Sequence, residues 1–200
     1  MAIKFNLGCF TESGLEFLIM HNITINQITQ ILPLEKIDWT SYFFSIALVV
    51  SSRADCGRRQ FGCIAVSPDK RILSTGYNSP PKGIPSKAQE YLSIHDCWPD
   101  RKDFHCCKSP DLPQNSSYES CNAIHSEINC LMEISTHNHY EWIDLYLAGR
   151  DGKNGQLIDA GPPCIYCARA ICNFNVRNIN CLMADSSIKV YLKSELKITL

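Results

Sequence analysis

The sequence predicts an α/β protein with a three-layer α-β-α arrangement, in which a mixed central β-sheet is flanked by helices. The first observation is the order of segments after residue 38, which alternate between helical spacing and β-rich runs as α-β-β-α-β-α-β. The second is the composition, because 200 residues with 45% hydrophobic and 20% charged residues are typical of a soluble globular chain. Such a chain fits one domain, or one domain with an appendage.

The first predicted helix begins after Asp38, a residue type that can cap a helix N-terminus. From there apolar residues recur at helical spacing over about four turns, namely Trp39, Phe43, Ile46, Ala47 and Val50. Two β-rich runs then flank the turn sequence SPDK at residues 67–70, and this pattern predicts a β-hairpin.

Residues 79–120 contain prolines, serines and scattered Cys and His residues. The segment is too long for a simple connection and indicates a functional or metal-clamped loop. The sequence CNAIHSEINCLMEIS at 121–135 then predicts a helix. Its buried side is expected to consist of Ile124, Ile128, Leu131 and Met132.

The last part of the chain predicts further strands and one more helix. IDLYLAG at 143–149 is a buried strand, and the Gly/Asp/Asn-rich segment 150–161 is a loop or small excursion. PPCIYCARAICNFNV at 162–176 predicts a helix with proline in its first turn. NINCLMA at 178–184 is a strand, and IKVYL at 188–192 is a candidate for one more. We expect the two helices that carry Cys and His to pack near each other.

An N-terminal extension of unknown role is expected at residues 1–34, followed by a folded domain at 35–200. Pro33 breaks any helix that precedes the domain. The first residues lack the basic start, long apolar core and cleavage site of a signal peptide, and the apolar runs are too short to cross a bilayer. We therefore expect a cytoplasmic protein with no membrane partner.

Charge and cysteine content narrow the function classes. The formal net charge of −1 gives no electrostatic footprint for a long polyanion, so a nucleotide-sized ligand suits the chain better than nucleic acid. The chain has 12 cysteines, more than packing requires. In a reducing cytoplasm such a cluster more often binds metal than forms disulfides.

Two short motifs supply the chemistry. His125 and Glu127 form H-x-E, and Pro163, Cys164 and Cys167 form P-C-x-x-C. One imidazole and two thiolates are three ligands of a tetrahedral zinc ion, with the fourth position left for water. At a helix N-terminus the two cysteines can both point at one ion in their thiolate form. Glu127 need not touch the metal and can move a proton.

Either motif alone is weak evidence for a catalytic zinc site, because C-x-x-C can be a redox pair or two core thiols, and H-x-E is common. In this order, on two predicted helices, they match the signature of zinc nucleobase deaminases. The chain resembles the cytidine deaminase superfamily, and within it the deoxycytidylate (dCMP) deaminase branch, over residues 38–184. DWTSYFFSIALVVSSRADCGRRQFGCIAVSPDKRILSTGYNSPP at 38–81 is similar to that branch's opening helix, its R-S-x-C-x-R-R-x-V-G-A strand and its G-Y-N-G-x-P turn. CNAIHSEINCL at 121–131 resembles its C-R-G-x-H-A-E-x-N-A-I helix.

The resemblance implies a cytidine-deaminase-like fold and a hydrolase acting on a cyclic amidine C–N bond. The implied reaction converts dCMP to dUMP and ammonia with a catalytic zinc. By similarity His125, Cys164 and Cys167 would bind the zinc, and Glu127 would be the proton shuttle. Asn78 of GYN would hold the sugar or base edge of the substrate, although a turn residue explains it equally well. The branch also suggests a homo-oligomer and a nucleotide effector.

A second, structural zinc is implied for some members of the branch. It would be held by the cysteine after the first helix, by Cys or His residues of the long loop, and by the cysteine before H-x-E. The candidate ligands here are Cys56, Cys97, His105, Cys106, Cys107 and Cys121. Free thiols are the alternative. Four other cysteines lie on predicted apolar faces and are most simply explained as core residues, namely Cys63, Cys130, Cys172 and Cys181.

Other residues admit two interpretations. Arg58 and Arg59 suit a substrate phosphate, but a solvated basic turn also explains them. Tyr166 and Trp98 could stack on a base, but buried packing accounts for either. The chain also departs from the branch pattern in four ways. GYNS and HSE replace GYNG and HAE, and no hydroxyl residue precedes P-C. The chain ends soon after NINCLMA at 178–184, so the last strands and helix of longer members are expected to be shortened or absent, and the inserted loop 150–161 is expected beside the pocket.

Three alternative functions are weighed against dCMP deamination. A polynucleotide cytosine or adenine deaminase needs an open basic groove, which the net charge disfavours. A non-catalytic zinc module would have no use for Glu127 as a base. A redox C-x-x-C protein would form a titratable disulfide when free of metal.

Overall fold

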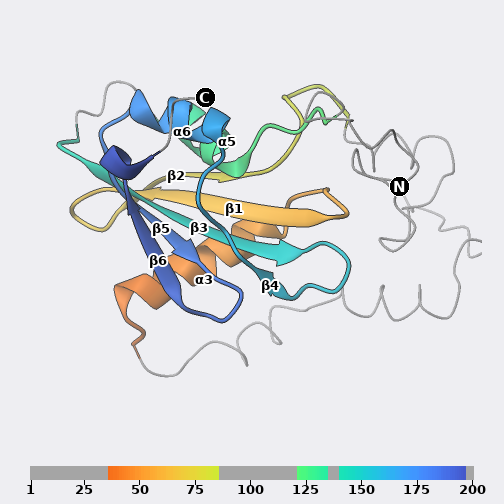
Figure 1. Cartoon of the computed structure of the whole chain (residues 1–200), viewed down its shortest axis with the longest axis horizontal. Coiled ribbons are helices and arrows are strands. Elements are labelled where there is room, and N and C mark those ends of the chain that lie inside the picture. Colours follow the sequence, from red (N-terminus) through yellow and green to blue (C-terminus); the bar gives the residue numbers. More distant parts are fainter. Residues whose placement is uncertain (1–35, 86–120, 135–139, 197–200) are drawn as a thin grey trace, which may run out of the picture.

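A single β-sheet organises the part of the chain that the structure describes, which in this computed structural model is residues 36–85, 121–134 and 140–196. Six strands form the sheet and helices lie on both of its faces, so the predicted α/β class and three-layer arrangement are confirmed (Figure 1). The predicted extension at 1–34 and most of the predicted loop at 79–120 lie outside the described residues.

The strands run in the order β2-β1-β3-β5-β6, with the short β4 paired to β3. Their bounds are β1 Arg59–Val66, β2 Ile72–Tyr77, β3 Ile143–Asp151, β4 Leu157–Ile158, β5 Val176–Leu182 and β6 Ile188–Leu192. Strands β3 and β5 are parallel and the other pairs are antiparallel, so the sheet is mixed as predicted. The parallel pair is joined by a crossover that contains a helix, because parallel neighbours cannot be linked by a tight turn.

Helix α3 (Trp39–Ser51) lies on one face of the sheet, and helices α5 (Ser126–Met132) and α6 (Ile165–Cys172) lie together on the other (Figure 1). A 3-10 helix, η3 (Lys193–Glu195), follows β6. The predicted proximity of the two helices that carry Cys and His is therefore confirmed. Across the described ranges, every helix falls short of the length and apolar character that a membrane span requires.

The predicted cap of α3 is confirmed. The Asp38 carboxylate accepts hydrogen bonds from the backbone N–H groups of Thr40 at 2.8 Å and Ser41 at 3.0 Å. These bonds satisfy N–H groups that have no partner within the helix. The buried side of α3 includes Phe43 and Phe44, whose rings both contact the Tyr146 ring of β3.

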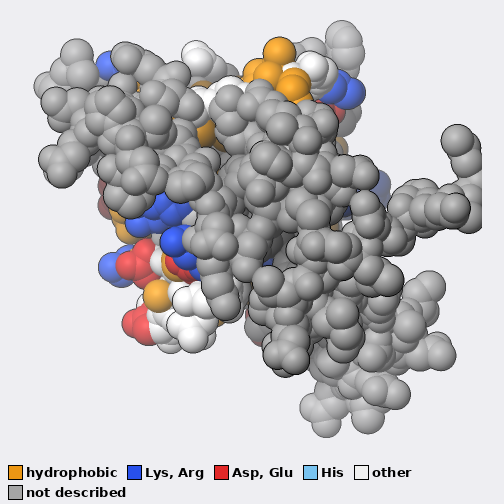
Figure 2. Space-filling model, turned by 90° about the vertical axis from the view of Figure 1, so that its right-hand side faces the viewer, with side chains coloured by type: hydrophobic (Ala, Val, Ile, Leu, Met, Phe, Trp, Pro, Cys, Tyr) orange, Lys and Arg blue, Asp and Glu red, His pale blue; other side chains and the backbone are white. Residues whose placement is uncertain are grey.

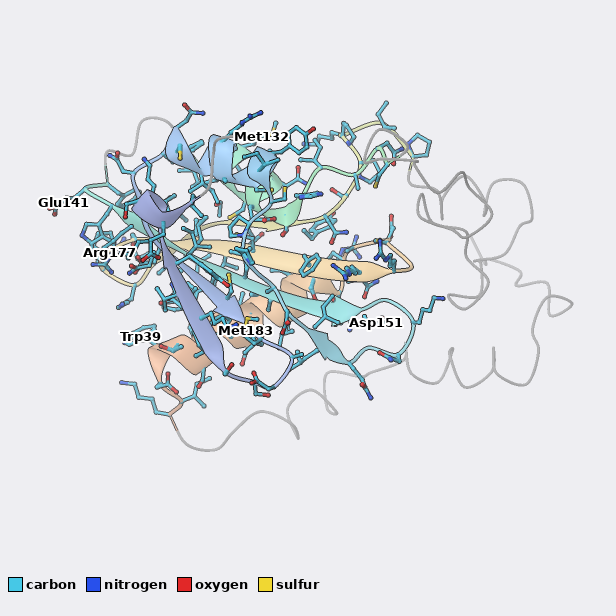
Figure 3. All side chains as sticks on the ribbon, viewed as in Figure 1. Trp39, Met132, Glu141, Asp151, Arg177 and Met183 are labelled. Carbon is cyan, nitrogen blue, oxygen red and sulfur yellow. The ribbon has the colours of Figure 1, made fainter. Side chains whose placement is uncertain are left out.

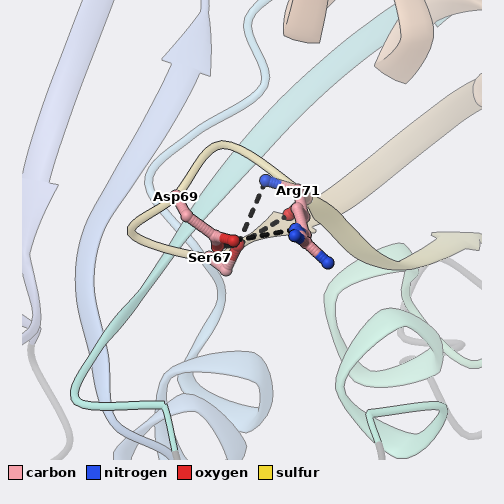
Figure 4. A network of polar contacts seen from close by, with 3 residues as sticks. All are labelled: Ser67, Asp69 and Arg71. Carbon is pink, nitrogen blue, oxygen red and sulfur yellow. Dashed lines mark hydrogen bonds and ion pairs between the residues drawn. The ribbon is translucent and has the colours of Figure 1, made fainter.

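The predicted hairpin is also confirmed, and a polar network closes its turn (Figure 4). The Ser67 hydroxyl donates to the Asp69 carboxylate and accepts a hydrogen bond from the Arg71 backbone N–H at 3.1 Å. Asp69 also pairs with the Arg71 guanidinium at 2.8 Å. The hydrogen bond from Ser67 is the main cause that lowers the pKa of Asp69.

The core between the sheet and the α5–α6 layer contains sulfur as well as aliphatic side chains. Cys63, Cys130 and Cys181 are fully buried there among Leu145 and Ile179. These three cysteines are core residues as predicted. The fourth, Cys172 at the end of α6, is only half-buried.

Both predicted helices that carry Cys and His are shorter in the structure. Helix α5 covers only Ser126–Met132, and His125 is its N-cap instead of an interior residue. The predicted burial of Met132 is wrong, since its side chain is 69% exposed and lies on the outer side of the helix layer (Figure 3). A helix of two turns can turn only a narrow stripe toward the sheet, and Cys130 and Leu131 occupy that stripe.

The prediction of proline in the first turn of the second helix is wrong as well. Helix α6 begins at Ile165 with Cys164 as its N-cap, and Pro162 and Pro163 precede the cap. The helix ends before Asn173 because β5 already begins at Val176. The predicted excursion at 150–161 is confirmed as the turn that carries β4 back along β3.

Two glycines in the hairpin allow the helix layers to approach the sheet closely. A Cβ atom on Gly62 would lie 2.0 Å from the backbone oxygen of Ala47 in α3. On the opposite face, a Cβ atom on Gly76 would lie 2.2 Å from the backbone nitrogen of Cys130 and 2.4 Å from the backbone oxygen of Ser126 in α5. Backbone atoms cannot move aside as a side chain does, so neither position tolerates alanine without a shift of the helix.

We expect Gly76→Ala to lower the free energy of unfolding by about 1–3 kcal/mol or more, because α5 must move away from β2. Urea denaturation followed by circular dichroism measures this change. The matched control is Thr75→Ala on the neighbouring exposed position of β2, which should stay within about 0.5 kcal/mol of the unsubstituted chain. A Gly76→Ala chain as stable as the control would contradict the close-approach argument.

Candidate functional site

Three metal-binding side chains meet where α5 and α6 begin. His125 is the N-cap of α5, Cys164 is the N-cap of α6, and Cys167 lies in the first turn of α6. The His125 Nδ1 atom lies 3.3 Å from Cys164 Sγ and 3.4 Å from Cys167 Sγ. All three donor atoms lie within 4.8 Å of one another. In the described ranges this is the only group of three or more His, Cys, Asp or Glu donors at such distances.

The distances between these donors fit a zinc ion. Zn–S bonds of about 2.3 Å and Zn–N bonds of about 2.1 Å in a tetrahedron separate a sulfur from a nitrogen by roughly 3.6 Å. The two observed distances of 3.3 and 3.4 Å are close to this value. A set of one imidazole and two thiolates also leaves one tetrahedral position open, as catalytic zinc sites do.

The electrostatics of the site favour a thiolate at Cys164. A hydrogen bond from the Cys167 thiol is the main cause that lowers the pKa of Cys164 to about 4. The same hydrogen bond, together with burial, raises the pKa of Cys167. The hydrogen bond to Cys164 also raises the pKa of His125. Cys164 is therefore charged at neutral pH, which is the form that binds metal and that a helix N-terminus stabilises.

Glu127 lies beside the three donors without belonging to their group. It is in the first turn of α5 and is 7% exposed. One carboxylate oxygen, Oε2, accepts a hydrogen bond of 2.9 Å from the Ser126 hydroxyl. A buried carboxylate is costly unless it is hydrogen-bonded, so this position indicates a chemical use.

A cavity of about 290 Å³ opens onto these groups. Its lining includes His125, Glu127 and Cys164, and its other walls come from β1, β3, the residue that follows β2, and the segments before α5 and α6. The volume is close to the lower end of the range for small-molecule sites, and polar and charged side chains line it together with apolar ones. The cavity suits a ligand of nucleotide size.

Arg58 and Arg59 line the same cavity, where the chain enters β1. Both side chains are exposed. Both arginines therefore lie around the pocket that Glu127 also lines. On the part of the described surface visible in Figure 2, Lys and Arg side chains lie among Asp and Glu side chains instead of forming a patch of one sign.

Asn78 lies at the cavity and also makes structural hydrogen bonds, and its predicted contact with a substrate stays a prediction. It lines the cavity and is 8% exposed. Its side-chain oxygen accepts a hydrogen bond from the Phe61 backbone N–H at 2.7 Å, and its amide nitrogen donates to the Arg59 backbone oxygen at 3.0 Å. The amide thus ties the end of β2 to the start of β1, and one amide hydrogen remains for another acceptor.

Of the six candidate ligands for a second metal, two lie among the described residues. Cys56 and Cys121 both line the cavity, so the two outer members of the set lie around one space. The other four lie outside the described residues, namely Cys97, His105, Cys106 and Cys107.

Of the two aromatic candidates for stacking on a base, Trp98 also lies outside the described residues. Tyr166 is 60% exposed, so the prediction that it is buried by packing is wrong.

Sequence reasoning missed three residues at the cavity. Phe61 lies on the same face of β1 as Arg59, and the period-2 alternation of strands could have found it. Asp159 comes from the inserted loop, and its Oδ1 accepts a hydrogen bond of 2.9 Å from the Ala184 backbone N–H. The expected place of this loop beside the pocket is confirmed. Ser126 was noted only as a departure from H-A-E.

Comparison with known proteins agrees with this geometry. The model of the family described as "Cytidine and deoxycytidylate deaminase zinc-binding region" matches residues 37–183. The deoxycytidylate deaminase of Saccharomyces cerevisiae is 27% identical over 185 residues, which are 88% of this chain and 50% of that protein. For the Schizosaccharomyces pombe deoxycytidylate deaminase the identity is 25% over 150 residues, covering 70% of this chain and 36% of that protein.

A phage relative has a length closer to that of this chain. The deoxycytidylate deaminase of Mycobacterium phage D29 is 26% identical over 142 residues, which are 71% of this chain and 92% of that protein. The chain thus spans half or less of the two yeast proteins and most of the phage protein. Because the family match runs over most of the chain and includes both H-x-E and P-C-x-x-C, the chain belongs to the cytidine and deoxycytidylate deaminase family.

Proposed function

We propose that this chain is a zinc-dependent hydrolytic deaminase of a cytosine nucleotide and that it converts dCMP to dUMP and ammonia. The observation that carries the proposal is that a buried carboxylate, two of the three metal-type donors and two arginines line one cavity, with the third donor beside the other two. The names of the relatives support a deoxycytidylate substrate. We assign this activity to a domain at residues 35–200 and treat 1–34 as an extension.

His125, Cys164 and Cys167 would hold the zinc ion. When bound, zinc acts as a Lewis acid that makes water nucleophilic near neutral pH. The protein's own contribution is to fix the three donors on two helix starts and to leave one side of the group facing the cavity. Buried apolar residues behind the donors keep competing water out, which strengthens electrostatic interactions inside the pocket.

Glu127 would move the protons of the reaction. Its carboxylate would accept one proton from the attacking water and deliver it to N3 of cytosine, and would then pass the second proton of that water to the leaving amine. The support for this role is a carboxylate that is 7% exposed and lines the cavity next to His125. A zinc module without catalysis would gain nothing from the cost of burying this group.

Arg58 and Arg59 would bind the 5′-phosphate, because planar guanidinium groups pair with phosphate oxygens. Asn78 would contact the sugar or base edge with its remaining amide hydrogen. Against a polynucleotide substrate stands the limited volume of the cavity. A homo-oligomeric state, a nucleotide effector and a cytoplasmic location stay predictions.

The zinc ligands are tested by the metal content of the purified chain. We expect Cys164→Ser to lose one zinc equivalent per chain, because a hydroxyl is a far poorer zinc ligand than a thiolate. Mass-spectrometric metal analysis measures the loss. Cys172→Ser at the end of the same helix is the matched control and should retain the zinc. Full zinc content in Cys164→Ser would refute the assignment.

Glu127→Gln separates catalysis from metal binding. The amide has the same shape but cannot accept the proton, so kcat for dCMP should fall by about 10²–10⁴-fold while the zinc content stays the same. The substrate panel consists of dCMP, deoxycytidine, dCTP and a cytosine-containing single-stranded oligonucleotide, with products identified by mass spectrometry. Glu133→Gln, an exposed acid after the same helix, is the control. Turnover of the oligonucleotide alone would move the chain to the polynucleotide class.

The arginines are tested by the ratio of nucleotide to nucleoside activity. We expect the double substitution Arg58→Ala and Arg59→Ala to lower kcat/KM for dCMP by about tenfold or more and to leave deoxycytidine nearly unaffected, because only dCMP carries the phosphate. Arg53→Ala, an exposed arginine before β1, is the control. An equal loss for both substrates would show that the arginines do not contact the phosphate.

A further inference from the structure

We propose that Ser126 is a positioning residue for Glu127, whose hydroxyl fixes one carboxylate oxygen so that the other stays directed to the reacting base. This inference rests on the proposed deamination and deepens it. It concerns a side chain that departs from the H-A-E pattern, so it describes this chain in particular.

The geometry of the pair is unusual for neighbours on a helix. Ser126 and Glu127 are consecutive residues of α5, and adjacent positions point about 100° apart around a helix axis. The 2.9 Å hydrogen bond between the Ser126 hydroxyl and Glu127 Oε2 therefore requires the glutamate side chain to bend back toward the start of the helix. The start of α5 is where His125 and the cavity lie.

Burial makes the hydrogen bond difficult to replace. Ser126 is 0% exposed and Glu127 is 7% exposed, so little water reaches either partner. A buried hydroxyl without a partner would be costly, and a hydrogen bond to a charged carboxylate is stronger than one between neutral groups. The hydrogen bond therefore stabilises both buried groups. It also holds the Glu127 side chain, which has three rotatable bonds, in one rotamer.

The other side chains near the carboxylate are thiols, including Cys167, which also makes a side-chain hydrogen bond with Glu127. Burial, with a smaller effect from the charge of Glu127, raises the pKa of Cys181 to about 12 and also raises the pKa of Cys63. Both remain neutral thiols, which are weak hydrogen-bond donors. Ser126 is the residue for which the described structure records a hydroxyl bond to the Glu127 carboxylate.

A fixed carboxylate matters for the proposed proton transfers. A general base has to lie within hydrogen-bond distance of the proton it takes, and small displacements of a catalytic group cost rate. With Oε2 engaged by Ser126, proton exchange would use the second oxygen, which keeps the same orientation between the two transfers. Ser126 would act on kcat through Glu127, to which its hydroxyl is hydrogen-bonded.

The test is Ser126→Ala in the full chain with zinc bound, assayed with dCMP. We expect kcat to fall by about tenfold, the strength of a hydrogen bond to a charged group, with KM within about twofold and unchanged zinc content. Ser126→Thr keeps a hydroxyl and should recover most of the lost kcat. In a Glu127→Gln background, Ser126→Ala should cause no further loss, because a residue that acts through Glu127 has nothing left to position.

Ser74→Ala is the matched control. Ser74 is also a buried serine, and its hydroxyl donates to the Cys130 backbone oxygen of the same helix at 2.8 Å. The substitution removes a buried hydroxyl and its hydrogen bond to α5 but leaves the Glu127 carboxylate in place, so kcat should be unchanged. An equal fall in kcat for Ser74→Ala and Ser126→Ala would assign the effect to a disturbed helix and overturn the inference.

The remaining outcomes separate the inference from the proposed function. A chain that deaminates dCMP equally well with Ser126 or alanine would refute the positioning role and leave the deaminase proposal standing. A zinc-loaded chain that deaminates none of the four substrates of the panel would refute the proposed function, and the positioning role would fall with it.

Discussion

The close packing of α5 on β2 is the constraint on which the site depends. Gly76 has no side chain, so the backbone of α5 at Ser126 and Cys130 can lie directly on the strand. This contact fixes the depth of His125, the N-cap of the helix, and of Glu127 in its first turn. Because α6 packs beside α5, the same contact also decides whether the two thiols of α6 can reach the imidazole. The metal group is therefore a consequence of helix position as much as of ligand identity.

One residue type performs two tasks in this layer, and local surroundings separate them. Cys164 lies at a helix start beside a hydrogen-bond donor, and its pKa is lowered to about 4. Cys181 lies in the core, and burial raises its pKa to about 12. The first is a charged thiolate and the second a small apolar side chain. A high cysteine count thus reflects both a metal site and a sulfur-containing core.

The sequence was sufficient for the fold class, the hairpin and the donor set, because these depend on local periodicity and on residue types with few alternative uses. It was not sufficient for the exact starts of α5 and α6. His125 was expected inside a helix and is an N-cap, and Cys164 lies at the helix N-terminus as expected but is the cap itself, with both prolines before it. A cap is decided by backbone conformation that tertiary packing imposes. Asp159 was missed because its place depends on a hydrogen bond to Ala184, 25 residues away in the chain. Contacts of that range leave no periodic signal.

The polar wall of the cavity shows why the role of Asn78 is difficult to isolate. Its amide binds the backbone of both Arg59 and Phe61, so it supports the strand that carries two other cavity residues. Replacement of Asn78 would therefore displace an arginine and an aromatic ring together with the amide itself. A loss of activity could arise from any of the three. The exposed side chains of Arg58 and Arg59 hold no such structural bond to β2, so their effect on nucleotide selectivity is the more direct measure of how the cavity distinguishes its substrate.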